Sequence, residues 1–154
     1  MQQLFDKQEF QKVQDHFCTL TGLYAYCVDD RGRNITEMSG NKEGVEILRK
    51  NIPEEEFYQI FKRVSGSGLE DMVVERTVYD NIRLAAVSVR ESGVQGNCFL
   101  ICCVLNEPVK GDCLKMPGQG MDPDTFYEAL DLIADLEHKM LAVASRIALK
   151  EDTK

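Results

Sequence analysis

The sequence predicts an α+β domain built on an antiparallel sheet that is covered on both faces. The main observation is the run 97–105, Asn-Cys-Phe-Leu-Ile-Cys-Cys-Val-Leu. From Cys98 on, its odd and even positions are both apolar, so as a strand it would present apolar side chains on both faces. Side chains alternate across a strand, so a strand with one solvated face would alternate apolar with polar residues. Two strand-like runs precede it, and helical spacing occurs at both ends of the chain. A buried helix is the rival interpretation, but the run is short and bounded by Gly96 and Pro108.

Composition and charge favour one soluble globular domain. The 154 residues are 44% apolar and 29% charged, which suits a single core. The net charge of −8 argues against direct binding to nucleic acid or to an anionic membrane. No signal peptide or membrane span is predicted, so we expect a cytoplasmic location. Most of the six cysteines fall inside predicted strands and helices, and we interpret them as buried free thiols.

An amphipathic helix is predicted over residues 7–21. Asp6 and Glu9 have the spacing of a capping box, and Gly22 suits the left-handed position that ends a helix. The predicted apolar stripe consists of Phe10, Val13, Phe17 and Leu20. A helix of this kind docks on a core through its stripe.

A β-hairpin and two short helices are predicted next. Residues 23–29 form a strand, Gly32 supplies positive φ in the turn, and residues 34–38 return as a second strand. Pro53 occupies an N1-like position before an acidic first helical turn. The apolar stripes of the two helices are Val45, Leu48 and Ile52, and then Phe57, Ile60, Phe61 and Val64.

Two further strands lead into the central one. Residues 71–79 and 82–90 read as strands joined by a tight turn at Asp80-Asn81, and a looser hairpin over 91–96 follows. Residues 106–120 are rich in proline and glycine and read as a linker.

A long helix is predicted from about Pro123 to Lys150, with Asp122 as its N-cap. Its apolar residues follow a four-three spacing that Glu137 interrupts. A helix with this much apolar surface must bury it on the domain, on a partner helix, or on both. We therefore expect a homodimer through the terminal helices. The predicted contact residues are Phe126, Leu130, Ile133, Leu136, Met140 and Ile147.

The order of elements resembles the PAS fold, a five-stranded antiparallel sheet with short helices on one face and N- and C-terminal helices on the other. Three stretches resemble the bacterial PocR sensory-domain family within that superfold. They are Phe10-Gln-Lys-Val-Gln-Asp-His-Phe17, Thr21-Gly-Leu23 and Val28-Asp-Asp-Arg-Gly-Arg-Asn-Ile-Thr36. The family pattern reads Leu-Gln-x-x-Gln-Asp-x-Phe, Thr-Gly-Leu and Val-Asp-x-x-Gly-x-x-x-Thr. Many members carry cysteines where residues 39–76 have none, so no role is transferred from them.

The resemblance implies a cytoplasmic small-molecule sensing domain of a bacterial signal-transduction or transcription-regulatory protein. Residues 1–110 would form the sensory domain, 111–121 a linker and 122–154 a signalling and dimerisation helix, with the output domain absent from this chain. The alternative is a ligandless dimerisation or docking domain of the same fold. The two differ in whether a cavity of roughly a few hundred Å³ stays open between sheet and helices.

The expected cavity nominates ligand-binding residues but no catalytic ones. They are Tyr24, Tyr26, Phe57, Phe61, Arg83, Ser88 and Cys102, with the facing of each strand undecided. Arg83 is interpreted either as a partner for a ligand carboxylate or phosphate, or as an edge charge in solvent. No nucleotide-binding glycine loop, zinc-spaced set or nucleophile elbow is present, so no enzyme, metal or cofactor is expected.

Overall fold

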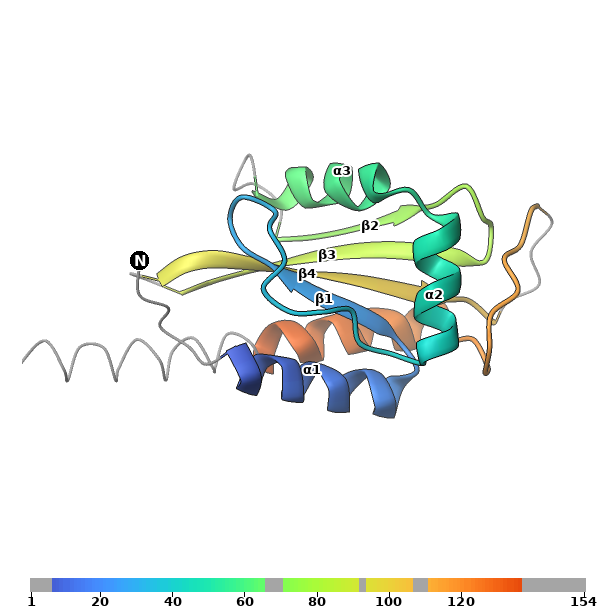
Figure 1. Cartoon of the computed structure of the whole chain (residues 1–154), viewed down its shortest axis with the longest axis horizontal. Helices are drawn as coiled ribbons and strands as arrows, with labels where there is room; N and C mark the ends of the chain where they lie inside the picture. The colour runs from blue at the N-terminus through green and yellow to red at the C-terminus, as the bar shows by residue number, and fades with distance from the viewer. Residues whose placement is uncertain (1–6, 66–70, 92–93, 107–110, 137–154) are drawn as a thin grey trace, which may run out of the picture.

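An antiparallel sheet of four strands lies at the centre of the described structure, in the order β1-β4-β3-β2 (Figure 1). The computed structural model describes residues 7–65, 71–91, 94–106 and 111–136. The strands are β1 (Tyr24–Val28), β2 (Met72–Arg76), β3 (Ile82–Glu91) and β4 (Val94–Val104).

The central position predicted for the doubly apolar run is confirmed. β4 pairs with β1 on one side and with β3 on the other, and it starts earlier than predicted, at Val94. Five consecutive residues from Phe99 to Cys103 are at most 3% exposed. Both faces of this strand are therefore covered, as a strand apolar at both parities requires.

Two helical layers cover the sheet. Helices α2 (Lys42–Asn51) and α3 (Glu54–Ser65) pack on one face, while α1 (Lys7–Thr21) and the helix over residues 123–136 pack on the other (Figure 1). The α2/α3 core contains Leu48, Ile52, Phe57, Ile60, Phe61, Val64, Leu84 and Leu100. The α1 core contains Phe10, Phe17, Phe99, Ile101, Phe126, Leu130 and Ile133. All four residues predicted for the α3 stripe are buried.

The predicted strand over 34–38 is wrong. Residues 34–39 form two isolated bridges with β1, Val28 with Asn34 and Ala25 with Ser39, and the Ile35 and Thr36 amides both donate to the Cys27 carbonyl between them. The returning chain has two more residues between these bridges than β1 has, so a regular ladder does not form. The Thr36 hydroxyl takes the place of a ladder carbonyl by accepting from the Cys27 amide at 2.7 Å. We call residues 34–39 the wall segment.

The chain turns at Asp80-Asn81 as predicted, with the Ile82 amide donating to the Tyr79 carbonyl at 3.1 Å, but the predicted strand over 71–79 is too long. β2 ends at Arg76, which pairs with Arg83, so a longer loop joins the two strands. That loop is held by the segment predicted as a linker. The Asn81 side chain exchanges two hydrogen bonds with the Leu114 backbone, at 2.8 and 2.9 Å, and the Asp80 amide donates to the Asp112 carbonyl at 2.7 Å. Residues 111–114 are thus packed on the domain.

One residue of the predicted α1 stripe is misplaced. Phe10 and Phe17 are buried, but Leu20 is 86% exposed. The buried position that the pattern missed is Gln14, at 0% exposed. Gly22 ends α1 with φ +79° and its amide donates to the Cys18 carbonyl, as the C-cap prediction requires.

Candidate functional site

A pocket of about 420 Å³ lies between the sheet and the α2/α3 layer. We call it the sheet–helix pocket. Its size falls in the range of small-molecule sites, roughly 300–1,000 Å³. The lining residues are Tyr26, Val28, Gly32, Asn34, Met38, Arg49, Ile52, Glu54, Glu55, Phe57, Tyr58, Phe61 and Leu100. Eight of the thirteen lining residues are aromatic or apolar, and the polar and charged ones, Asn34, Arg49, Glu54 and Glu55, are exposed.

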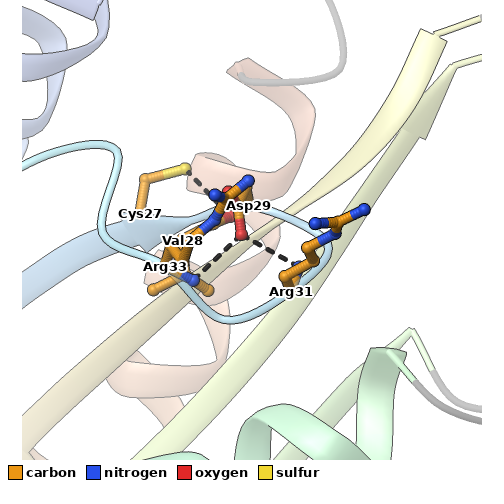
Figure 2. A network of polar contacts seen from close by, with 5 residues as sticks. All are labelled: Cys27, Val28, Asp29, Arg31 and Arg33. Carbon is orange, nitrogen blue, oxygen red and sulfur yellow. Dashed lines mark hydrogen bonds and ion pairs between the residues drawn. The ribbon is translucent and has the colours of Figure 1, made fainter.

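A short turn after β1 forms one wall of the pocket. The Asp29 carboxylate accepts hydrogen bonds from the Arg31 and Arg33 amides, both at 2.9 Å, and pairs with the Arg33 side chain at 3.0 Å (Figure 2). Gly32 lies inside this turn with φ +81°, as predicted, and packs on Phe61: an added Cβ would lie 3.0 Å from the ring. At Gly32 the turn therefore packs its backbone directly on the aromatic rings of the pocket, an approach that a side chain at this position would prevent.

The charge of Asp29 stabilises this turn. Partial burial alone would raise the pKa of its carboxyl, but hydrogen bonds from the Arg33 and Arg31 amides, and the Arg33 guanidinium, hold the pKa below its usual value. The carboxylate is thus ionised at neutral pH and keeps the turn closed.

The wall segment is tied to α1 by buried hydrogen bonds. The Gln14 amide nitrogen donates to the Glu37 carbonyl at 2.8 Å and to the Ser39 hydroxyl at 2.7 Å. The Gln14 amide oxygen accepts from the Thr36 hydroxyl at 2.7 Å. All polar atoms of this fully buried side chain thus bind the wall segment, which satisfies a group that would otherwise destabilise the core.

Two neighbours on α1 extend this attachment toward solvent. The Gln11 side chain accepts from the Glu37 amide at 2.9 Å and donates to the Ser39 hydroxyl at 3.1 Å, and Asp15 also accepts from Ser39. Gln11, Gln14 and Asp15 are the three polar residues of the Phe10–Phe17 stretch that the quoted family pattern specifies. The function of that motif in this fold is therefore to hold the wall segment, which places Met38 in the pocket.

Three of the seven predicted ligand-binding residues line the pocket: Tyr26, Phe57 and Phe61. The rings of Tyr26 and Phe57 meet edge to face at 5.8 Å. Tyr24 and Cys102 belong to the same core but do not line the pocket. Helix α2 packs directly on Tyr24, since a Cβ on Gly44 would lie 1.9 Å from the Tyr24 hydroxyl. Ser88 also lies outside the lining.

Arg83 lies on the other face of the sheet. Leu84 and Ala86 face α3, so Arg83 shares the parity of Ala85, which belongs to the α1 core. Its guanidinium donates to the Asp80 carbonyl at 2.8 Å. The sheet therefore separates Arg83 from the pocket, and Arg83 is not one of the lining residues.

The charged residues of the pocket were missed from the sequence. Arg49 comes from the last turn of α2, and Glu54 and Glu55 come from the first turn of α3. In the sequence they look like ordinary exposed helix residues. One signal for them was present in the sequence. The predicted end of one helix is basic at Arg49, the predicted start of the next is acidic at Glu54 and Glu55, and the short connection brings both charges to one junction.

The described cysteines are buried thiols, apart from the exposed Cys113, and none of these five forms a disulfide. Burial raises the pKa of Cys18 to about 12, with a further contribution from Asp15, and raises the pKa of Cys103 to about 12 against the opposing effect of Arg83. Burial also raises the Cys102 pKa well above its usual value. These thiols are poor nucleophiles, because the thiolate is the reactive form.

The residues predicted to form a dimer contact fall into three groups: buried in the core, half-buried, and outside the described residues. Phe126, Leu130 and Ile133 are at most 1% exposed and belong to the core under α1. Leu136 is half-buried, and Met140 and Ile147 lie outside the described residues. Within the described residues of this helix, 123–136, the large apolar side chains that face solvent are Tyr127 and Leu132, at 51% and 50% exposed.

The described residues form neither a metal-binding cluster nor a membrane-spanning helix. In that part of the chain no three His, Cys, Asp or Glu side chains lie close enough to hold a metal ion together. No helix there has the length and apolar character to cross a membrane.

Comparison with known proteins gives one family match. The model of a family described as "Sensory domain found in PocR" matches residues 3–55, about a third of the chain. This range contains β1, α2, the Asp29 turn and the wall segment, so the similarity covers one side of the sheet–helix pocket. No curated protein matches the chain.

Proposed function

We propose that this chain is a cytoplasmic, non-enzymatic ligand-sensing domain of a bacterial signal-transduction or transcription-regulatory protein. The observation that carries the proposal is the sheet–helix pocket of about 420 Å³, which remains open between the two layers. Its lining combines eight aromatic or apolar residues with a few polar and charged ones, which is the usual residue composition of a small-molecule site. The similarity of residues 3–55 to a sensory-domain family supports the same assignment.

The attachment of α1 to the wall segment offers a route for the signal. A ligand that contacts Met38 acts on a segment bound to Gln14 through three hydrogen bonds. A ligand shifts a conformational equilibrium only when it binds two states with different affinity. The two states proposed here differ in the position of the wall segment, and α1 follows that position.

Asn34→Trp tests the pocket itself. Asn34 lines the pocket while its side chain is exposed, so an indole can fill the mouth with little disturbance of the core. A ligand that binds only the folded state raises stability by about 2.7 kcal/mol at a hundredfold excess over Kd. In a thermal-shift screen of small acids, amines, amino acids and diols, we expect stabilising ligands for the parent protein and loss of their effect in Asn34→Trp.

Glu37→Trp is the matched control, because Glu37 is an exposed neighbour outside the pocket lining. It should keep the ligand response. Native mass spectrometry of freshly purified protein provides an independent test by detecting retained ligand. If no compound stabilises the parent and no ligand is retained, the chain is a ligandless docking domain and the sensing proposal is wrong.

The second part of the proposal is a homodimer through the terminal helices. The half-exposed Leu132 supports it, because such a side chain gains roughly 1.5–3 kcal/mol on full burial. We expect sedimentation equilibrium at tens of micromolar to give a dimer, and Leu132→Glu to weaken it. Asp131→Asn, at an exposed neighbouring position, is the control. A monomeric parent protein would contradict this part alone.

A further inference from the structure

All charged residues of the sheet–helix pocket come from the junction between α2 and α3. Arg49 belongs to the last turn of α2, Glu54 and Glu55 belong to the first turn of α3, and only residues 50–53 separate them. The rest of the lining is aromatic, aliphatic or uncharged. The pocket therefore combines eight aromatic or apolar residues with charges of both signs, which all come from the α2–α3 junction.

These charges do not neutralise one another. Within the described ranges, Arg49 and Glu54 form no ion pair and no hydrogen bond through their side chains. Glu55 accepts one hydrogen bond, from the Gln59 side chain at 2.7 Å, which directs its carboxylate along α3. A guanidinium and two carboxylates thus remain available for a ligand at the same end of the pocket.

Only one arrangement of ligand charge complements this end. A lone carboxylate would be attracted by Arg49 and repelled by Glu54 and Glu55, and a lone ammonium would meet the opposite pair of effects. A ligand that carries both groups satisfies both signs, with its carboxylate on Arg49 and its ammonium on the glutamates. The apolar remainder of such a ligand then faces Tyr26 and Phe57, whose rings already meet edge to face.

We propose that the sheet–helix pocket takes a zwitterionic small molecule with a large apolar body, which is the chemistry of an apolar α-amino acid. This inference rests on the proposed sensing function and deepens it by naming the class of ligand. Arg49 selects the carboxylate, the two glutamates select the ammonium, and the aromatic lining selects the size of the apolar body.

A matched set of four probes tests the charge requirement. L-phenylalanine carries both charges, 3-phenylpropanoate only the carboxylate, 2-phenylethylamine only the ammonium, and 2-phenylethanol neither. Isothermal titration of the full chain should give the tightest binding for L-phenylalanine. Each missing charge should weaken binding by about three- to tenfold, since these side chains are partly exposed to solvent.

Two variants should separate the roles of the charges. Arg49→Met should weaken L-phenylalanine and 3-phenylpropanoate about equally and leave 2-phenylethylamine unchanged or tighter. The double variant Glu54→Gln, Glu55→Gln should weaken L-phenylalanine and 2-phenylethylamine and spare the acid. Lys50→Met and Glu46→Gln are matched controls on α2, exposed and outside the lining, and should change nothing.

The outcomes distinguish this inference from the proposed function. If the acid, the amine or the alcohol binds as tightly as L-phenylalanine, or if the variants affect all probes alike, the zwitterion assignment is wrong while sensing stands. If none of the four probes binds but another metabolite stabilises the parent protein and not Asn34→Trp, the assignment is again wrong and sensing stands. If nothing binds at all, both fall.

Discussion

Phe126→Ala is expected to lower the free energy of unfolding by about 3–5 kcal/mol, the usual cost of deleting a buried phenylalanine ring. Phe126 is 1% exposed and packs in the α1 core together with Leu130 and Ile133. Tyr127→Ala is the matched control: it is the next residue on the same helix, an aromatic of similar size, and 51% exposed. The measurement is the free energy of unfolding of each variant from a guanidinium chloride titration. The comparison is valid when the variants share the same dependence of that free energy on denaturant concentration.

The same packing predicts what a truncation would do. A chain ending at Gly120 would lose Phe126, Leu130 and Ile133 and expose their partners in the core, so it should unfold or aggregate instead of remaining a stable sensor domain. The sequence-based division into a sensory domain, a linker and a separate signalling helix does not anticipate this dependence. If Phe126→Ala costs no more than Tyr127→Ala, the helix does not contribute to the core in the way described.

Gln14→Leu is expected to cost about 2–3 kcal/mol, although leucine matches glutamine in size and suits a buried helix position. The substitution removes three hydrogen bonds and leaves the Thr36 hydroxyl without its acceptor inside the protein. A buried polar group that loses its partner costs about 1–3 kcal/mol. The measurement is again the free energy of unfolding from a denaturant titration.

Gln11→Leu provides the control for this prediction. Gln11 lies on the same helix and binds the same wall segment, but its hydrogen bonds are near solvent, so water can replace them. We expect a cost below about 1 kcal/mol, typical of an exposed hydrogen bond. Equal costs at positions 11 and 14 would contradict the special role given to Gln14. Ligand affinity measured in Gln14→Leu further reports whether the wall segment shapes the pocket.

Local patterns predicted the elements that depend on local physics. The period-3.6 stripe of Phe57, Ile60, Phe61 and Val64 identified α3, and the two-parity run identified β4. Gly22 and Gly32 take the positive φ expected from their positions. These predictions succeed because capping, turn geometry and burial of an apolar face act within a few residues.

The wrong predictions depend on partners far away in the sequence. The alternating residues 34–38 look like a strand, but Thr36 and Ser39 bind Gln14, which lies more than twenty residues earlier. The facing of Arg83 depends on its pairing with Cys103, which the sequence of β3 alone does not specify. Arg49 is a different case: its pocket partners Glu54 and Glu55 are close in sequence, but the pattern does not specify how α2 meets α3. In all three cases tertiary packing decides the outcome, and the local pattern does not contain that information.

The adjacent residues Cys102 and Cys103 place one thiol in each half of the interior, because successive side chains of a strand point to opposite faces. A thiol reagent reaches either sulfur only when the layer above it opens, and such local openings differ in free energy across a protein. The modification rate of Cys102 thus measures fluctuations of the α2/α3 layer, and that of Cys103 measures fluctuations of the layer formed by α1 and residues 123–136. Two adjacent residues thus report separately on local opening of the helical layers on the two sides of the sheet.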